Sequence, residues 1–174
     1  MHEHFDLIIE PLSPDRVKKM LEENCIFINQ YAEQFFAHPR FSSTQKVDIS
    51  VLIASLHEIG FKSGATLDDI FKRIPSIGLR PCPPSTGVFL RLLWKDQPQS
   101  QNSILSGTHG SPDLAVTVLS EVVSRNDDFP KGLYLRNVEG NLWLRGYICD
   151  ASYRFPGDAL FVFEKASDPV FYNG

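Results

Sequence analysis

The sequence has little cysteine, no long apolar run and no Sec-type signal pattern in its first residues. Three widely separated cysteines without C-x-x-C spacing argue against a disulfide framework and against a cysteine-ligated zinc site. No window of about 18 apolar residues is present, so we expect no membrane-spanning helix and no membrane partner. The first residues lack a basic segment followed by an apolar stretch. Together these absences predict a soluble, cytoplasmic protein.

Positive charge is outnumbered, with 17 Lys and Arg against 21 Asp and Glu. The formal net charge is −4 and the isoelectric point is about 5.7. Proteins that bind the nucleic-acid backbone do so largely through clustered Lys and Arg, so nucleic acid is the least favoured class of partner. Phenylalanine, in contrast, is frequent, with 13 residues. This abundance indicates an aromatic-rich core or an apolar contact surface.

Signature motifs of known reactions are missing as well. The glycine-containing loop 107–113 lacks the lysine of a P-loop and the glycine pattern of a nucleophile elbow. His57-Glu58 lacks the second histidine of a zinc-protease helix. We therefore predict no metal site and no cofactor. The length of 174 residues is typical of one domain, and we predict a single domain over residues 1–174.

Helical spacing characterises the first part of the chain, residues 1–75. Ser13 is a suitable N-cap and Pro14 suits the first helical position, while Pro39 disfavours helical geometry in the residue before it. Thr66 opens a further segment with acidic residues in its first turn, where they favour a helix. The predicted helices span residues 13–38, 48–58 and 66–75.

Three apolar residues of the first predicted helix, Ile26, Phe27 and Phe36, lie off its main apolar stripe. A helix this broadly apolar is either buried on two sides or packed against a partner. We expect burial within the monomer, and a homodimer formed through the first helix is the alternative.

Strand-like runs and turn signals characterise residues 79–174. Glu139-Gly140 is the strongest hairpin signal in the chain. The polar segment 95–112 is predicted to be a long loop. The segment 114–123 fits both periodicities, and we predict a helix there because Ser111-Pro112-Asp113 is typical of a helix start. The order of elements predicts an α+β fold in which N-terminal helices pack with a C-terminal antiparallel sheet. The predicted strands span residues 88–94, 133–138, 141–149 and 159–164.

One pattern in this second part suggests a binding surface. Alternation along 133–138 and 141–149 puts mostly leucines on one face and a set of aromatic and arginine side chains on the other. We expect the leucines and Ile148 in the core and the second set on the outside. We call this second set the aromatic–arginine face; it consists of Tyr134, Arg136, Trp143, Arg145 and Tyr147.

A few other residues have catalytic potential. The loop 107–113 contains His109 and Ser111 near a carboxylate, and Cys149 ends an apolar strand. A nucleophilic thiol or hydroxyl needs a base or a positive field beside it, and the sequence alone does not reveal such proximity. The simpler interpretations are a turn for the loop and an inert buried thiol for Cys149.

The leading hypothesis is therefore a non-catalytic binding module that recognises a protein or carbohydrate-like partner through the aromatic–arginine face. Aromatic and arginine side chains most often dominate the energy of interfaces. The alternative is a small hydrolase-like enzyme in which Cys149 or Ser111 is the nucleophile and His109 the base. Nucleic-acid binding through the same face ranks third because the chain is acidic.

Overall fold

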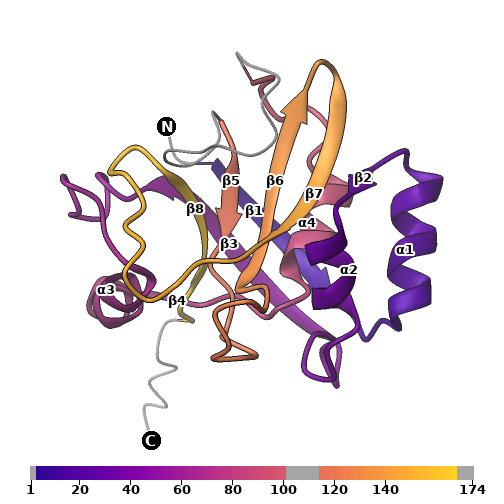
Figure 1. Cartoon of the computed structure of the whole chain (residues 1–174), viewed down its shortest axis with the longest axis horizontal. Helices are drawn as coiled ribbons and strands as arrows, with labels where there is room; N and C mark the ends of the chain where they lie inside the picture. Colours follow the sequence, from indigo (N-terminus) through magenta and orange to yellow (C-terminus); the bar gives the residue numbers. More distant parts are fainter. Residues whose placement is uncertain (1–2, 101–113, 168–174) are drawn as a thin grey trace, which may run out of the picture.

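A curled sheet of eight strands organises the part of the chain that the structure describes, residues 3–100 and 114–167 (Figure 1). In this computed structural model the fold is mixed α+β. Its helices are α1 (Pro14–Glu23), α2 (Gln30–Phe36), α3 (Leu67–Arg73), α4 (Thr86–Leu93) and a short 3-10 helix η1 (Ile74–Ile77). Its strands are β1 (Glu3–Ile9), β2 (Phe27–Ile28), β3 (Val47–Ser55), β4 (Leu79–Arg80), β5 (Val116–Val118), β6 (Gly132–Val138), β7 (Asn141–Tyr147) and β8 (Leu160–Lys165).

The strand order in the sheet is β1-β3-β8-β5-β6-β7-β2, with β4 pairing on β8. Most neighbours are antiparallel, but β5 runs parallel to β8 and β2 runs parallel to β7. The prediction of a purely antiparallel, C-terminal sheet is therefore wrong, because β1, β2 and β3 of the N-terminal part are members of the same sheet. The coarser prediction, a mixture of helices and an extended sheet, is confirmed.

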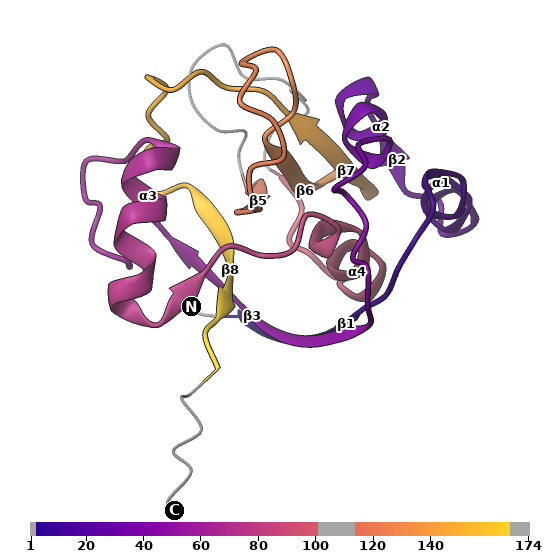
Figure 2. The same ribbon diagram turned by 90° about the horizontal axis from the view of Figure 1, so that it is seen from below.

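The two faces of the sheet carry two separate apolar cores. Along β8, Val162 belongs to one core while Phe161 and Phe163 belong to the other, as expected when successive side chains point to opposite faces. Figure 2 shows the sheet curling around α4, which contacts β1, β6 and β7, while α3 lies on the other side of β8. The first core therefore fills the inside of the curl, and the second lies between β8 and α3.

The first predicted helix is interrupted by a strand. After α1, Cys25 takes a left-handed backbone conformation with φ 55°, and Phe27 and Ile28 then pair with β7. The Asn29 side chain accepts a hydrogen bond from the Ala32 N–H and so caps the start of α2. The pairing with β7 is a long-range contact, which explains why helical spacing alone concealed the break.

The predicted helix over 48–58 is wrong, because these residues form most of β3. Ile49, Val51 and Ile53 are buried with a period of two residues, and β1 and β8 pair with the strand on either side. Branched side chains at these positions suit a pleated strand. The prediction considered only helical spacing here and overlooked the burial of every second residue from 49 to 53.

Two further segments have the opposite secondary structure to the one predicted. Residues 88–94, predicted as a strand, lie mainly in α4, which is enclosed by the curled sheet and therefore lacks a polar side from which its period could be recognised. Residues 114–123, predicted as a helix, contain the short strand β5, whose three residues are all buried between β8 and β6. Central strands of this kind appear in a sequence as unbroken apolar runs. Within the predicted loop, residues 95–100 contain neither helix nor strand.

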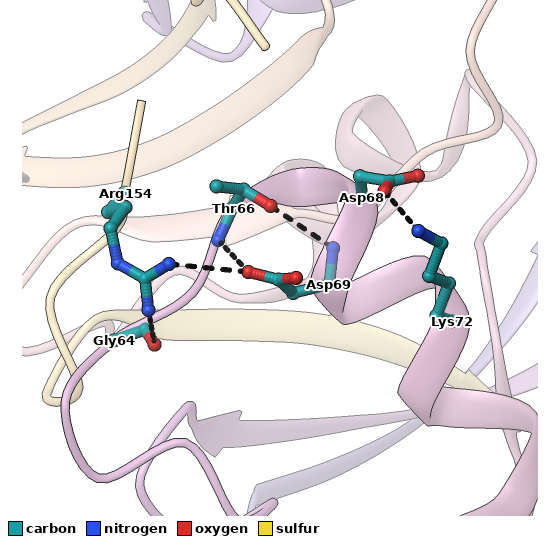
Figure 3. A network of polar contacts seen from close by, with 6 residues as sticks. All are labelled: Gly64, Thr66, Asp68, Asp69, Lys72 and Arg154. Carbon is teal, nitrogen blue, oxygen red and sulfur yellow. Dashed lines mark hydrogen bonds and ion pairs between the residues drawn. The ribbon is translucent and has the colours of Figure 1, made fainter. Parts of the chain in front are cut away.

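Other local predictions are confirmed. The three closing strands are present as β6, β7 and β8, and the β6–β7 turn has positive φ angles at Glu139 (53°) and Gly140 (82°), as a tight hairpin turn requires. Helix α3 starts where predicted. Thr66 and Asp69 cap it reciprocally, and Arg154 joins the cap with bonds to Gly64 O (2.8 Å) and to the Asp69 carboxylate (3.5 Å; Figure 3).

Candidate functional site

The hairpin register places all five residues of the aromatic–arginine face on one side of the sheet. Tyr134 lies opposite Arg145, and Arg136 lies opposite Trp143, while Tyr147 continues the row at the far end of β7. Cross-strand partners share a face, so the predicted grouping holds. The predicted exposure does not hold for every member.

Three members of this face are buried or packed inward. Arg136 is fully buried, and its Nε–H donates to the Ser100 hydroxyl at 2.8 Å. Tyr134 is only 8% exposed. The ring of Tyr147 meets Phe155 edge-on at 6.2 Å between centroids, and burial raises the pKa of its phenol. The expectation that the whole set faces solvent is therefore wrong, because residues 97–100 and the second core cover parts of it.

The remaining members meet a residue that the sequence analysis assigned to a helix. Phe27 on β2 pairs in register with Trp143 on β7, and the two rings lie 5.1 Å apart between centroids at an angle of 33°. Phe27 is 48% exposed, whereas Trp143 is partly buried. The sequence identifies Phe27 only as a residue off the apolar stripe of a predicted helix, and it does not predict this pairing with Trp143.

Arg145, which is partly buried, completes this surface. Its Nε–H donates to the Tyr134 hydroxyl at 2.8 Å, and its Cζ lies 5.1 Å from the centroid of the Trp143 ring. Two contacts of this kind, a hydrogen bond and a cation–π contact, fix the orientation of the guanidinium group. Its Nη1 and Nη2 groups form no hydrogen bond or ion pair with any residue in the described part of the chain. We call Phe27, Trp143 and Arg145 the shelf.

The shelf is held by the junction between β2, α2 and β7. The side chain of Asn29 donates to Gly146 O at 3.0 Å and accepts from Gly146 N at 2.8 Å, so an amide group extends the β2–β7 pairing by one more step. Gly146 permits this close approach because a Cβ at its position would lie 2.5 Å from the Tyr31 carbonyl carbon and 2.6 Å from the Ala32 nitrogen. Phe27 is thus fixed beside Trp143 by backbone geometry.

The leucine face of the hairpin behaves mostly as predicted. Leu133, Leu135 and Leu144 are fully buried in the first core, and Leu142 packs against it. Ile148, which was predicted to join them, is exposed because it lies beyond the end of β7. The shelf therefore lies on the outer face of a hairpin whose inner face is tightly packed.

The catalytic candidates are not brought together among the described residues. Partial burial raises the pKa of Cys149 to about 11; nearby Lys131 lowers it, and Asp150 and Asp127 raise it further. At neutral pH this thiol is protonated, which is unfavourable for a nucleophile. His109 and Ser111 lie outside the described residues.

Hollows lined by other residues lie away from the shelf. One of about 610 Å³ covers the outer side of β1, β3 and β8 and contains the ion pair between Arg80 and Glu164. A second hollow of about 340 Å³ is lined by residues that include Leu52, Arg73 and Leu79. A small cavity of about 80 Å³ lies beside Trp94 and Gln97. In residues 3–100 and 114–167, His, Cys, Asp and Glu side chains form no cluster of three or more suited to a metal ion.

None of the helices within the described residues has both the length and the apolar character needed to cross a membrane. Comparison with known proteins adds no further constraint: no family model matches the chain, and neither a curated protein nor a solved structure shows detectable similarity to it. The candidate site therefore rests on the geometry of the shelf itself.

Proposed function

We propose that this chain is a non-catalytic binding module that docks a protein partner on the shelf formed by Phe27, Trp143 and Arg145. One observation carries the proposal: a half-exposed phenylalanine ring packs at a tilt against a tryptophan ring, beside an oriented guanidinium group. Trp and Arg are the side chains most enriched at energetic hot spots of interfaces, and large exposed apolar residues are a common feature of docking surfaces.

The shelf is pre-organised, which favours binding. Each of its side chains is held by a contact within the chain, so little conformational freedom remains to be lost when a partner docks. Burying the exposed half of the Phe27 ring under a partner would contribute about 1 kcal/mol. Surface side chains that lack such intramolecular contacts lose conformational entropy on binding, which offsets much of the free energy gained by burial.

A protein partner fits this geometry better than a carbohydrate or a nucleic acid. Sugars and bases stack on an open aromatic ring face, whereas Phe27 and the Arg145 guanidinium already pack against the Trp143 ring. A protein surface needs no open ring face, since it can pack against the edges of Trp143 and the exposed side of Phe27. The acidic character of the chain also disfavours nucleic acid.

The test is a selection of short random peptides displayed on phage against the intact protein. We expect enriched peptides to lose binding to Phe27→Ala and Trp143→Ala variants. The matched control is Ile8→Ala, since Ile8 is 52% exposed but lies on β1, at the other end of the strand order. Peptides that bind all three variants equally would contradict the proposal, as would enrichment that depends on Ile8.

The enzymatic alternative has no supporting observation among the described residues. The raised pKa of Cys149 disfavours a thiolate nucleophile. A hydrolase based on His109 and Ser111 stays a sequence-based prediction, since both residues lie outside the described part of the chain.

A further inference from the structure

We infer that the docking segment of the partner carries a carboxylate next to an apolar side chain, and that this carboxylate is bound by Nη1 and Nη2 of Arg145. The inference rests on the proposed function and specifies the chemistry of its partner. The apolar side chain would pack on Phe27, and the carboxylate would meet the guanidinium beside Trp143.

The first step of the argument is the orientation of the guanidinium. An arginine can bind a carboxylate through Nε and one terminal nitrogen, or through both terminal nitrogens. In Arg145 the Nε–H is already donated to the Tyr134 hydroxyl at 2.8 Å. The paired Nη1 and Nη2 groups are therefore the remaining fork, and its plane is restrained by the contact with the Trp143 ring.

The second step is the missing counter-charge. Two other arginines have one, since Arg80 pairs with Glu164 and Arg154 pairs with Asp69. Arg40 and Arg73 donate instead to neutral groups. No carboxylate within residues 3–100 and 114–167 forms an ion pair with Arg145. A partner that covers Phe27 and Trp143 also removes water from this guanidinium, which is costly unless the partner supplies a negative charge.

The third step is the size of the charge that fits. Phosphate groups are generally recognised by clusters of arginines. The next guanidinium in this row, that of Arg136, is fully buried and donates to Ser100, so it is not presented beside the shelf. One oriented fork matches one carboxylate, as found in an aspartate or glutamate side chain or at a chain terminus.

The experiment uses two displayed libraries of random short peptides, one with all amino acids and one without Asp and Glu and with a blocked C-terminus. We expect tight binders from the complete library only, with an acidic residue near an apolar one. Their affinity should fall by about tenfold or more in Arg145→Gln, because a charge-assisted fork is lost. Arg145→Lys keeps the charge but not the fork. Its affinity for these peptides should lie between those of the wild type and of Arg145→Gln.

Exchanging the charges of Arg145 and of the peptide distinguishes a lost ion pair from a variant that has lost its structure. Arg145→Glu should lose the acidic peptides and bind the same peptides once their acidic residue is replaced by lysine. Equally tight binders from the acid-free library that depend on Phe27 and Trp143 but not on Arg145 would overturn the inference and leave the proposed function standing. Binders that ignore Phe27 and Trp143 would overturn both.

Discussion

An inner strand of the sheet, β8, and the strand next to its β2 end, β7, differ in how their faces are covered. In β8, Val162 is buried in the first core while Phe161 packs between Phe155 and Phe163 in the second, so the strand has no free face. In β7, Leu144 is buried on the inner side, but Trp143 and Arg145 are only partly covered on the outer side. A strand apolar on both faces serves the fold, whereas β7 leaves a tryptophan and an arginine partly exposed, and the binding surface that we propose lies there.

The largest expected effect tests this contrast in coverage. Phe161→Ala should lower the free energy of unfolding by about 4 kcal/mol, because it leaves a cavity within a cluster of aromatic rings. Phe27→Ala should cost about 1 kcal/mol or less, since its ring is already half in solvent. Urea denaturation followed by circular dichroism measures both. Phe161→Leu serves as the milder variant should the alanine protein fail to fold. Equal losses for Phe27 and Phe161 would show that the shelf is part of a core.

A second, intermediate effect concerns the junction that holds the shelf. Gly146→Ala should cost about 2 kcal/mol, because the new Cβ meets backbone atoms of Tyr31 and Ala32 and forces α2 away from β7. Gly140→Ala is the control: no atom lies within 4 Å of its position, so only its φ of 82° opposes the change. That strain is about 1 kcal/mol. A Gly140→Ala protein less stable than the Gly146→Ala protein would show that close packing at Gly146 does not hold α2 against β7.

The smallest expected effect lies at the opposite side of the molecule, in the cap of α3. Thr66→Ala should cost about 1 kcal/mol through loss of the N-cap hydrogen bond. Hydrogen bonds from Thr66 also hold the pKa of Asp69 below its usual value. The Asp69 carboxylate therefore stabilises the fold above its unfolded pKa of about 4, and this contribution fades as pH falls through the lower folded value.

Urea titrations of the wild type and of Asp69→Asn at neutral pH and near pH 3 measure this dependence. We expect the wild type to lose more stability on acidification than the variant does. Identical losses would mean that the Asp69 cap does not contribute to acid sensitivity. Asp68→Asn is the matched control, because Asp68 is exposed and pairs only with Lys72 among the contacts drawn in Figure 3.

Local chemistry in the sequence predicted those elements that local chemistry determines. The cap at Thr66 and the turn at Glu139-Gly140 are set by neighbouring residues, and both were located correctly. The segments at β3, α4 and β5 were assigned wrongly because their state depends on long-range pairing or on enclosure by the sheet. Short apolar runs fit both helices and buried strands, so periodicity alone does not distinguish them.

The candidate site was predicted in part for the same reason. Alternation along the hairpin correctly grouped Trp143 and Arg145 with Tyr134, because cross-strand neighbours follow from one turn. The burial of Arg136 and the arrival of Phe27 depend on segments distant in sequence, namely Ser100 and β2. No pattern within the hairpin contains that information.

The most direct measurement is the quenching of Trp143 fluorescence by iodide and by caesium ions. The chain has two tryptophans, so Trp94→Phe isolates Trp143, and Trp143→Phe isolates Trp94, which is nearly buried. A partly exposed Trp143 beside the Arg145 guanidinium predicts quenching of Trp143 that is greater with iodide than with caesium, and weaker quenching of Trp94 by either ion. Equal protection of the two tryptophans, or stronger quenching of Trp143 by caesium, would contradict the claim that this end of the sheet presents a surface for an acidic partner.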